Sequence, residues 1–378
     1  MKSSLCILHW MPVECFPPAI NMARYFADHD QWAVSVCTNW NHLDRRHFTH
    51  PSANLIRGTF PTDEIGFKWV LAYLSFHLKS LWHILKTSPD IILYIEPHSA
   101  LPVFLSRLIG RRSCLFIHYH EYHSPNEFTK PGMRMAKWFH KLEKSWLYPS
   151  AEWISQTNED RVRLFIEDNH EIEQSKLNVL PNYPPSYWFN GDNRAWKGMQ
   201  PNSTVIRLVY VGSLSRVDAF IEEVVTWIMQ LERPTVTLDI YSYNIHTETR
   251  EYLREIGCAQ IRLHEKGVDY DDLPNLLRDY HVGLILYKGN TPNYVYNATN
   301  KLFEYLACGL DVIYPRKMSG VKPYACSTLK PRVIECEFEN MNNYSYQLHG
   351  REQLPSADLQ PNNEVVMKKL EKVMLDSI

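Results

Sequence analysis

Short apolar runs alternate with longer segments of helical period in the first half of the chain. The apolar runs lie at 5–8, 32–37, 90–95 and 114–117, and the periodic segments lie at 19–28 and 68–86. A run that is apolar without alternation predicts a strand buried on both faces. Because helical segments separate these runs, the pattern predicts a parallel sheet covered by helices on both sides.

The alternation stops between Tyr183 and Thr204, a segment without sustained period that carries Pro184, Pro185, Gly191, Gly198 and Pro201. This composition is typical of a linker between domains. The alternation then resumes, with strands predicted at 206–211, 236–241, 261–263, 282–286 and 312–314 and helices at 219–231, 248–256, 272–279, 300–307 and 364–375.

The pattern therefore predicts an α/β chain made of two Rossmann-like, doubly wound domains. The first domain is placed at 1–185, the linker at 186–204 and the second domain at 205–355. The segment 356–378 contains the last helix, which we expect to pack back on the first domain. Ligands of open α/β sheets bind beyond the carboxyl ends of the strands, so a cleft with two such edges is expected to hold the substrates.

Composition excludes several classes of function. Lys plus Arg number 40 against 42 Asp plus Glu, and this balance argues against a nucleic-acid partner. None of the eight cysteines forms a CxxC pair, so they are expected to be free thiols in a reducing compartment. The first residues do not have the pattern of a signal peptide and no segment has the length of a membrane span. We therefore expect a cytoplasmic protein.

The predicted helix 300–307 begins with residues suited to an anion. A loop of small and polar residues precedes it, so the amides of Thr299, Asn300 and Lys301 are expected to point toward the predicted cleft. The helix dipole and the charge of Lys301 both favour a phosphate there, and Glu304 is placed to accept hydrogen bonds from ribose hydroxyls. The same residues also fit a well-capped core helix with a Lys and a Glu on its surface.

The segment 301–313 resembles the donor-site helix of GT-B glycosyltransferases of family 4. Other segments resemble that family in the same order: the glycine turn at 208–215, the base-holding segment at 267–280, the His-Glu motif at 118–122, and the segments 156–160 and 180–182. This resemblance implies the GT-B fold and transfer of a sugar from a nucleoside diphosphate to a hydroxyl of a glycan. The implied acceptor is a surface polysaccharide or a lipid-linked oligosaccharide.

The resemblance also implies the site residues. Those implied to bind the donor are Gly212, Ser213, Leu214, Val268, Tyr287, Lys288, Asn297, Thr299, Asn300, Leu302 and Glu304. The catalytic set is His120, Glu121, Arg216 and Lys301, and His118 is expected to contact the acceptor or the transferred sugar. It further implies retention of configuration and neither an obligate metal nor a bound cofactor. Among donors, we expect UDP-sugars ahead of GDP-sugars.

The sequence departs from the family at three places. Tyr296 stands where many members have a first glutamate, Asp218 follows Arg216 where a lysine is usual, and 17–19 reads Pro-Pro-Ala instead of a double glycine. The missing glutamate at Tyr296 affects which donor the chain is expected to use and whether it is expected to transfer a sugar at all. Two other functions therefore remain open: a nucleotide-sugar epimerase on the same fold, and a non-catalytic partner that has lost transfer.

Two further segments each allow more than one interpretation. Residues 118–123 include the HExH spacing from His120 to His123, which fits a substrate-contacting loop, structural histidines, or a metal site in which His118 and His120 join a distant third ligand. The segment 130–146 is basic, with Trp138 and Trp146 at helical spacing. Such a helix either contacts an anionic membrane surface or packs its aromatic face into the core.

Overall fold

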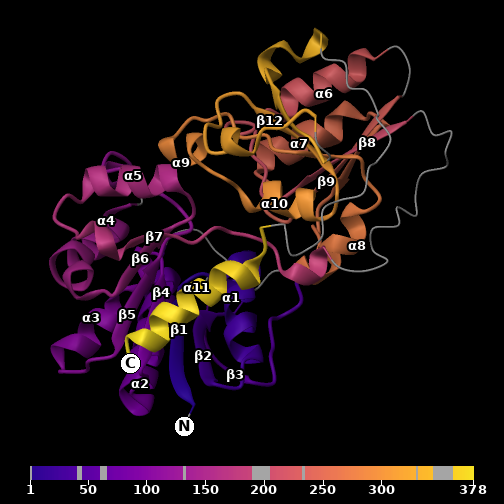
Figure 1. Cartoon of the computed structure of the whole chain (residues 1–378). Coiled ribbons are helices and arrows are strands. Elements are labelled where there is room, and N and C mark those ends of the chain that lie inside the picture. Colours follow the sequence, from indigo (N-terminus) through magenta and orange to yellow (C-terminus); the bar gives the residue numbers. More distant parts are fainter. Residues whose placement is uncertain are drawn as a thin grey trace. The chain divides into compact units, whose positions relative to one another are not determined.

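The computed structural model describes residues 2–40, 45–59, 66–130, 133–189, 205–231, 235–328, 331–343 and 361–378. These residues form two compact units (Figure 1). The first unit contains 1–182 together with 363–378, and the second contains 183–362. Most of the predicted linker, at 190–204, and residues 344–360 near the predicted end of the second domain lie outside the described residues.

The first unit is built on a parallel sheet of seven strands in the order β3-β2-β1-β4-β5-β6-β7. The strands are β1 (Ser3–His9), β2 (Trp32–Asn39), β3 (Ala53–Gly58), β4 (Ile91–Ile95), β5 (Cys114–His118), β6 (Trp153–Gln156) and β7 (Leu177–Val179). Its helices are α1 (Pro17–Asp28), α2 (Phe67–Thr87), α3 (Leu101–Leu108), α4 (Arg134–Leu142), α5 (Glu159–Asp168) and α11 (Asn363–Asp376). Strand β4 is buried along its whole length and β1 is buried from Leu5 onward, as continuous apolar runs predict.

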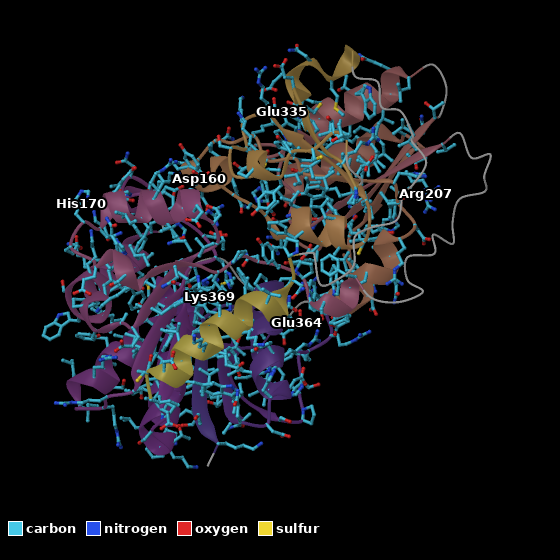
Figure 2. All side chains as sticks on the ribbon, viewed as in Figure 1. Asp160, His170, Arg207, Glu335, Glu364 and Lys369 are labelled. Atoms are coloured by element: carbon cyan, nitrogen blue, oxygen red, sulfur yellow. The ribbon has the colours of Figure 1, made fainter. Side chains whose placement is uncertain are left out.

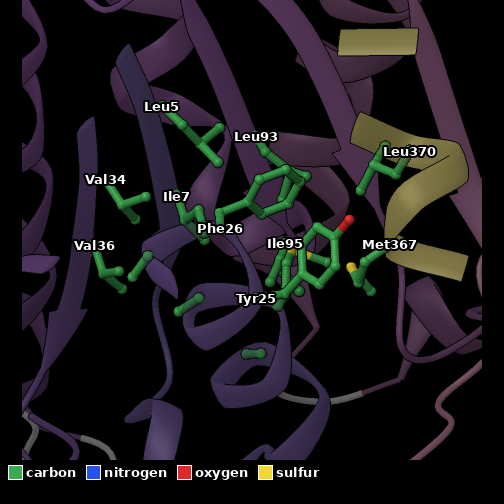
Figure 3. Packing of buried hydrophobic residues seen from close by; sticks show 14 of the residues in the cluster. Leu5, Ile7, Tyr25, Phe26, Val34, Val36, Leu93, Ile95, Met367 and Leu370 are labelled. Carbon is green, nitrogen blue, oxygen red and sulfur yellow. The ribbon is translucent and has the colours of Figure 1, made fainter. Parts of the chain in front are cut away.

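Each face of this sheet has its own apolar core. On one face α1 and α11 pack over the sheet, and Figure 3 shows Phe26 of α1 and Met367 of α11 among side chains of the strands. On the other face α2 supplies Tyr73 and Phe76, which pack with Leu115 and Ile117 of β5. The successive side chains of a strand point to opposite faces, so each apolar run serves both cores.

Helix α11 belongs to the first unit although it follows the second in sequence. Its Glu371 carboxylate accepts hydrogen bonds from the Tyr25 hydroxyl at 2.8 Å and from the Trp32 indole N–H at 2.7 Å. Figure 2 shows Lys369 on the same helix, and its ammonium lies 5.9 Å from the centre of the Trp153 ring. Leu370, which lies between Lys369 and Glu371 in the sequence, is fully buried.

The second unit contains a parallel sheet of six strands in the order β10-β9-β8-β11-β12-β13. The strands are β8 (Ile206–Val211), β9 (Val236–Tyr241), β10 (Ile261–His264), β11 (Val282–Leu284), β12 (Asp311–Pro315) and β13 (Val333–Cys336). The helices are α6 (Ile221–Gln230), α7 (Thr247–Ile256), α8 (Leu273–Leu277), α9 (Pro292–Val295) and α10 (Asn300–Ala307). The order reverses between β8 and β11, as in doubly wound sheets.

The structure differs from the sequence prediction at several elements. Strands β3, β6, β7 and β13 and helices α3, α5 and α9 were not predicted. Helix α6 begins at Ile221 instead of 219, and the predicted helix 272–279 is shortened to α8 behind a turn of 3-10 helix at Tyr270–Asp272. The missed strands are short or interrupted by polar residues, so their apolar pattern is weak.

Candidate functional site

Helix α10 begins at the predicted residue, and its first turn forms the centre of the candidate donor site. Thr299 precedes the helix in extended conformation, and the N–H groups of Asn300 and Lys301 have no preceding helical carbonyl to bond. Burial of the Glu304 carboxyl raises its pKa to about 7, although Lys301 and a hydrogen bond from Asn300 oppose the shift. Glu304 is 5% exposed. The helix thus offers free donors, one cation and one buried carboxyl.

The Lys301 side chain is held by two tyrosines. Its Nζ donates to the Tyr287 hydroxyl at 2.9 Å and lies 5.8 Å from the centre of the Tyr210 ring. Tyr210 is on β8 and Tyr287 follows β11, so the two central strands of the sheet position this ammonium. Within the described residues, no carboxylate forms a hydrogen bond or an ion pair with this ammonium. A cation held by phenols keeps its charge available for an anion.

The glycine turn after β8 lies against this lysine. Gly212 has a φ of +132°, and a Cβ placed on it would lie 2.7 Å from Lys301 Cε and 2.9 Å from Nζ. Only glycine combines that backbone conformation with room for the lysine. The turn is tied to the sheet by the Gly212 N–H, which donates to the Tyr241 carbonyl at 3.0 Å, and the Val211 N–H donates to the Tyr305 hydroxyl at 3.1 Å. We call Gly212, Tyr287, Lys301 and Glu304 the Lys301 site.

The other residues predicted to contact the donor differ in how far they are exposed to solvent. Leu214 and Leu302 are buried, while Ser213 is exposed and its carbonyl accepts from the Tyr210 hydroxyl at 2.6 Å. Val268 and Asn297 are half-buried. The structure brings Gly212, Tyr287 and Lys301 together, and the contacts of all the predicted residues with a donor stay predictions.

Arg216, the second predicted phosphate cation, is engaged by another residue. Its guanidinium donates to Glu222, with Nε at 2.9 Å from Oε1, and it lies 4.5 Å from the centre of the Tyr252 ring. The Lys288 Nζ donates to the Arg216 carbonyl at 3.0 Å and lies 3.6 Å from Glu223 Oε1. Both cations are therefore paired with carboxylates of α6.

In the first unit, the predicted His-Glu motif, residues 118–122, begins with the last residue of strand β5, and we call it the His-Glu loop. His118 donates to or accepts from the Ser155 hydroxyl at 2.9 Å, and its ring lies 4.7 Å from that of His120. Burial lowers the pKa of His118 well below its usual value and that of His120 to about 4. Both rings are therefore neutral near pH 7. Glu121 is exposed.

Glu96, which the sequence analysis missed, holds this loop in place. It follows β4 with a φ of +66°, and its Oε1 accepts the N–H groups of His120 at 2.8 Å and Glu121 at 3.0 Å. Burial raises the pKa of Glu96 to about 8, with Glu121 adding to the shift. The signal was available: a carboxylate follows a buried strand that pairs Ile95 with His118.

Arg161 also holds the His-Glu loop in place, through hydrogen bonds from its guanidinium. The Arg161 Nη1 donates to the His120 carbonyl at 2.6 Å and to the Thr157 hydroxyl at 2.9 Å, and its side chain is 1% exposed. A pocket of about 200 Å³ lies beside the loop within the first unit. Its lining includes Glu121, His123, Phe128, Lys141, Tyr148 and Gln156.

The metal interpretation of the HExH spacing finds no further ligands in the described part of the chain. No group of three or more His, Cys, Asp or Glu side chains there is arranged to hold a metal ion. His118 uses its Nδ1 on Ser155, and His120 contacts His9 through a ring pair at 6.0 Å. This geometry is that of a buried, neutral histidine cluster.

The raised pKa of Glu96 makes stability depend on pH. The folded chain binds the Glu96 proton more tightly than a carboxyl with the ordinary pKa of 4.5 does. The stabilisation that this proton gives the folded state is therefore complete below pH 4.5 and is lost as the pH rises to about 8. We expect Glu96→Gln, which keeps an oxygen acceptor for both N–H groups, to flatten the fall in free energy of unfolding between pH 5 and 8. Urea unfolding at several pH values measures this slope. The exposed Glu152→Gln serves as control, and an unchanged slope in Glu96→Gln would contradict the assignment.

Comparison with known proteins identifies the fold. No protein-family model matches the chain, and no curated protein matches its sequence. Among solved structures, it superposes on sucrose-phosphate synthase from Thermosynechococcus elongatus with a TM-score of 0.61 at 14% identity, covering 86% of this chain and 84% of that one. HepE of Anabaena, in complex with UDP and glucose, gives 0.62 at 13% identity over 90% and 88%. The apo lipopolysaccharide outer core galactosyltransferase WaaB gives 0.61 at 12% over the full length of both chains.

The chain has the GT-B fold. The fold class predicted from the sequence is thereby confirmed, while membership of family 4 stays a prediction. Within this GT-B chain, the Lys301 site lies at the carboxyl end of β8 and the His-Glu loop at the carboxyl end of β5. Both are edges where ligands of doubly wound sheets bind.

Proposed function

We propose that this chain is a glycosyltransferase that moves a sugar from a nucleoside-diphosphate donor, UDP ahead of GDP, to a hydroxyl of a glycan. The acceptor is a surface polysaccharide or a lipid-linked oligosaccharide, and the reaction takes place in the cytoplasm. The observation that carries the proposal is the Lys301 ammonium, which is held by phenols against the Gly212 turn at the start of α10.

The main chemical task is to stabilise the diphosphate leaving group. Negative charge grows on the departing phosphate as the glycosidic bond breaks, and donors fixed in advance stabilise it without reorganisation. Lys301 and the N–H groups of Asn300 and Lys301 supply these donors, and Glu304 accepts from the ribose hydroxyls. The proposed reaction retains the anomeric configuration and needs no metal and no bound cofactor.

The first unit supplies the proposed acceptor residues. His118 and His120 are neutral at pH 7, so they donate or accept single hydrogen bonds to sugar hydroxyls without charge. Glu121 is exposed and its backbone is fixed by Glu96, which suits a residue that orients a sugar. Solved structures of HepE hold UDP-glucose, or UDP with glucose, and this supports the uridine donor.

One observation favours a second candidate. Tyr296 precedes α10 where a carboxylate for the sugar is usual, and its backbone packs against Gly320, where an added Cβ would lie 2.5 Å from the Tyr296 carbonyl carbon. A chain without that carboxylate fits a partner subunit that binds a nucleotide but does not transfer. An epimerase on this fold is distinguished by acting on the donor alone.

Calorimetric titration with UDP and GDP tests the proposal. We expect UDP to bind the wild-type chain, and Glu304→Ala to weaken the affinity about tenfold by removing the ribose acceptor. The exposed Glu255→Ala on α7 is the matched control and keeps full affinity. No binding of either nucleotide by the wild type would contradict the proposal. Binding without transfer to any glycan acceptor would favour the partner subunit, and conversion of the donor alone would favour the epimerase.

A further inference from the structure

Helix α2 carries a row of large apolar side chains on its outer side. Phe67, Leu78 and Trp82 are 77%, 64% and 70% exposed, and Val70, Leu71 and Leu74 are about half exposed. We call these six residues the apolar face of α2. Monomeric proteins rarely leave so continuous an apolar row in water, so this face indicates an interaction surface.

The helix is apolar on two opposite sides. At 100° per residue, the six exposed positions fall within about a third of the circumference. The opposite side carries Ala72, Phe76 and Ile84, which are buried against the sheet of the first unit. The core therefore accounts for one apolar side of α2 and leaves the other without a partner within the described residues.

The surroundings of the face are basic. Lys68, Lys79 and Lys86 follow one edge of the row at the same helical spacing, and residues 66–89 contain no Asp or Glu. Residues 97–113, which include α3, also contain neither, while they carry Arg107, Arg111 and Arg112. The Arg111 guanidinium donates to the Leu85 carbonyl at 3.1 Å, which places this charge beside the end of α2.

We propose that the apolar face of α2 docks on an anionic lipid bilayer and lies in the plane of its headgroups. Charge selects this occupant, because lysines and arginines border the face and no carboxylate of 66–89 or 97–113 opposes an anionic surface. The aromatic side chains at both ends of the row, Phe67 and Trp82, suit the boundary between headgroups and acyl chains. No described helix is long and apolar enough to cross a membrane, so α2 contacts one leaflet only.

The contacts of the segment 130–146 fit, in part, the second of its two interpretations, packing into the core. Phe139 of α4 is buried with Tyr73 of α2, so part of the aromatic face serves the core. Trp138 and Trp146 are 51% and 57% exposed, and the Trp146 ring lies 5.9 Å from that of Phe104 on α3. This segment adds flanking contacts, and α2 makes the principal one.

Sedimentation with lipid vesicles tests the surface with the full chain. We expect the wild type to bind vesicles of phosphatidylcholine and phosphatidylglycerol at 7:3, to bind pure phosphatidylcholine weakly, and to dissociate from the anionic vesicles as salt is raised. The variant Phe67→Ser/Leu78→Ser/Trp82→Ser is expected to lose binding at least tenfold. Replacing Lys86 and Arg112 by Gln should weaken binding about fivefold per charge.

The matched control is Met229→Ser on α6, which removes a 55%-exposed apolar side chain from the second unit and should bind vesicles as the wild type does. Circular dichroism verifies that each variant is folded, and UDP titration verifies that the donor site is intact. Three results would overturn the proposal: no binding of the wild type to anionic vesicles, unchanged binding of the α2 variant, or a wild-type dimer in analytical ultracentrifugation that the α2 variant abolishes. The last result would assign the face to a second copy of the chain.

Discussion

Lys301→Met is expected to lower the rate of sugar transfer by about 100-fold or more, because it removes the one side-chain cation of the Lys301 site. The charge that the ammonium opposes grows as the donor bond breaks, so the loss should appear in kcat more than in KM. The methionine side chain keeps most of the volume, and it leaves the Gly212 turn and the two tyrosines packed. Steady-state kinetics with the UDP-sugar identified by titration measures the change.

Comparing the binding of UDP and uridine distinguishes a contact of Lys301 with phosphate from a role of Lys301 in the fold of the site. We expect Lys301→Met to weaken UDP binding and to leave uridine binding unchanged, since uridine carries no phosphate. Lys372→Met, an exposed change on α11, is the control for the loss of a lysine. Equal losses for UDP and uridine would show that Lys301 supports the fold of the site and does not contact the diphosphate.

The second large effect is on stability. Arg57 of β3 donates to Glu14 at 2.7 Å, and the two side chains are 4% and 3% exposed. Arg57 Nη2 also donates to the Phe48 carbonyl at 2.8 Å, while Glu14 accepts the Phe48 N–H at the same distance. We expect Arg57→Met to destabilise the first unit by about 3–5 kcal/mol, because it leaves a buried carboxylate without its partner.

A double-variant cycle tests the origin of this loss. Adding Glu14→Gln to Arg57→Met removes the unpaired charge, so the double variant should be more stable than Arg57→Met alone. Urea unfolding followed by circular dichroism gives the midpoints, and the exposed Arg262→Met on β10 is the control. A loss in the double variant as large as the sum of the two single losses would mean that the pair does not interact.

The same ion pair explains an error in the sequence prediction. Residues 53–58 show neither a continuous apolar run nor a strict alternation and lie in a long polar segment, so no strand is predicted there, yet they form β3 at the edge of the sheet. The polar Arg57 is accommodated there because Glu14 and the backbone of Phe48 satisfy its guanidinium. That compensation comes from residues 9 and 43 positions away in the chain, so no local pattern could indicate it.

The candidate site, too, was predictable from the sequence only in part. Helix α10 begins where the sequence predicts, because a polar loop followed by an apolar period fixes a helix start locally. The partners of Lys301 were not predictable, because Tyr210 on β8 and Tyr287 after β11 come together only when these two strands pair. The hydrogen bond from Arg216 to Glu222 could not be predicted either, and the role of Arg216 at the phosphate stays a prediction. Glu96 was missed although its place after a buried strand was visible, because only the pairing of β4 with β5 brings the N–H groups of His120 and Glu121 to it.

By itself, the sequence determined that this chain is a two-sheet α/β protein, because continuous apolar runs can be buried only in parallel sheets covered on both sides. It also determined the anion-suited start of α10, since capping and helix period are local properties. Only the tertiary structure decided which charges are neutralised and which remain available, and which apolar face of α2 has no partner among the described residues. Those outcomes depend on side chains from separate strands and helices, and only packing brings them within hydrogen-bond distance.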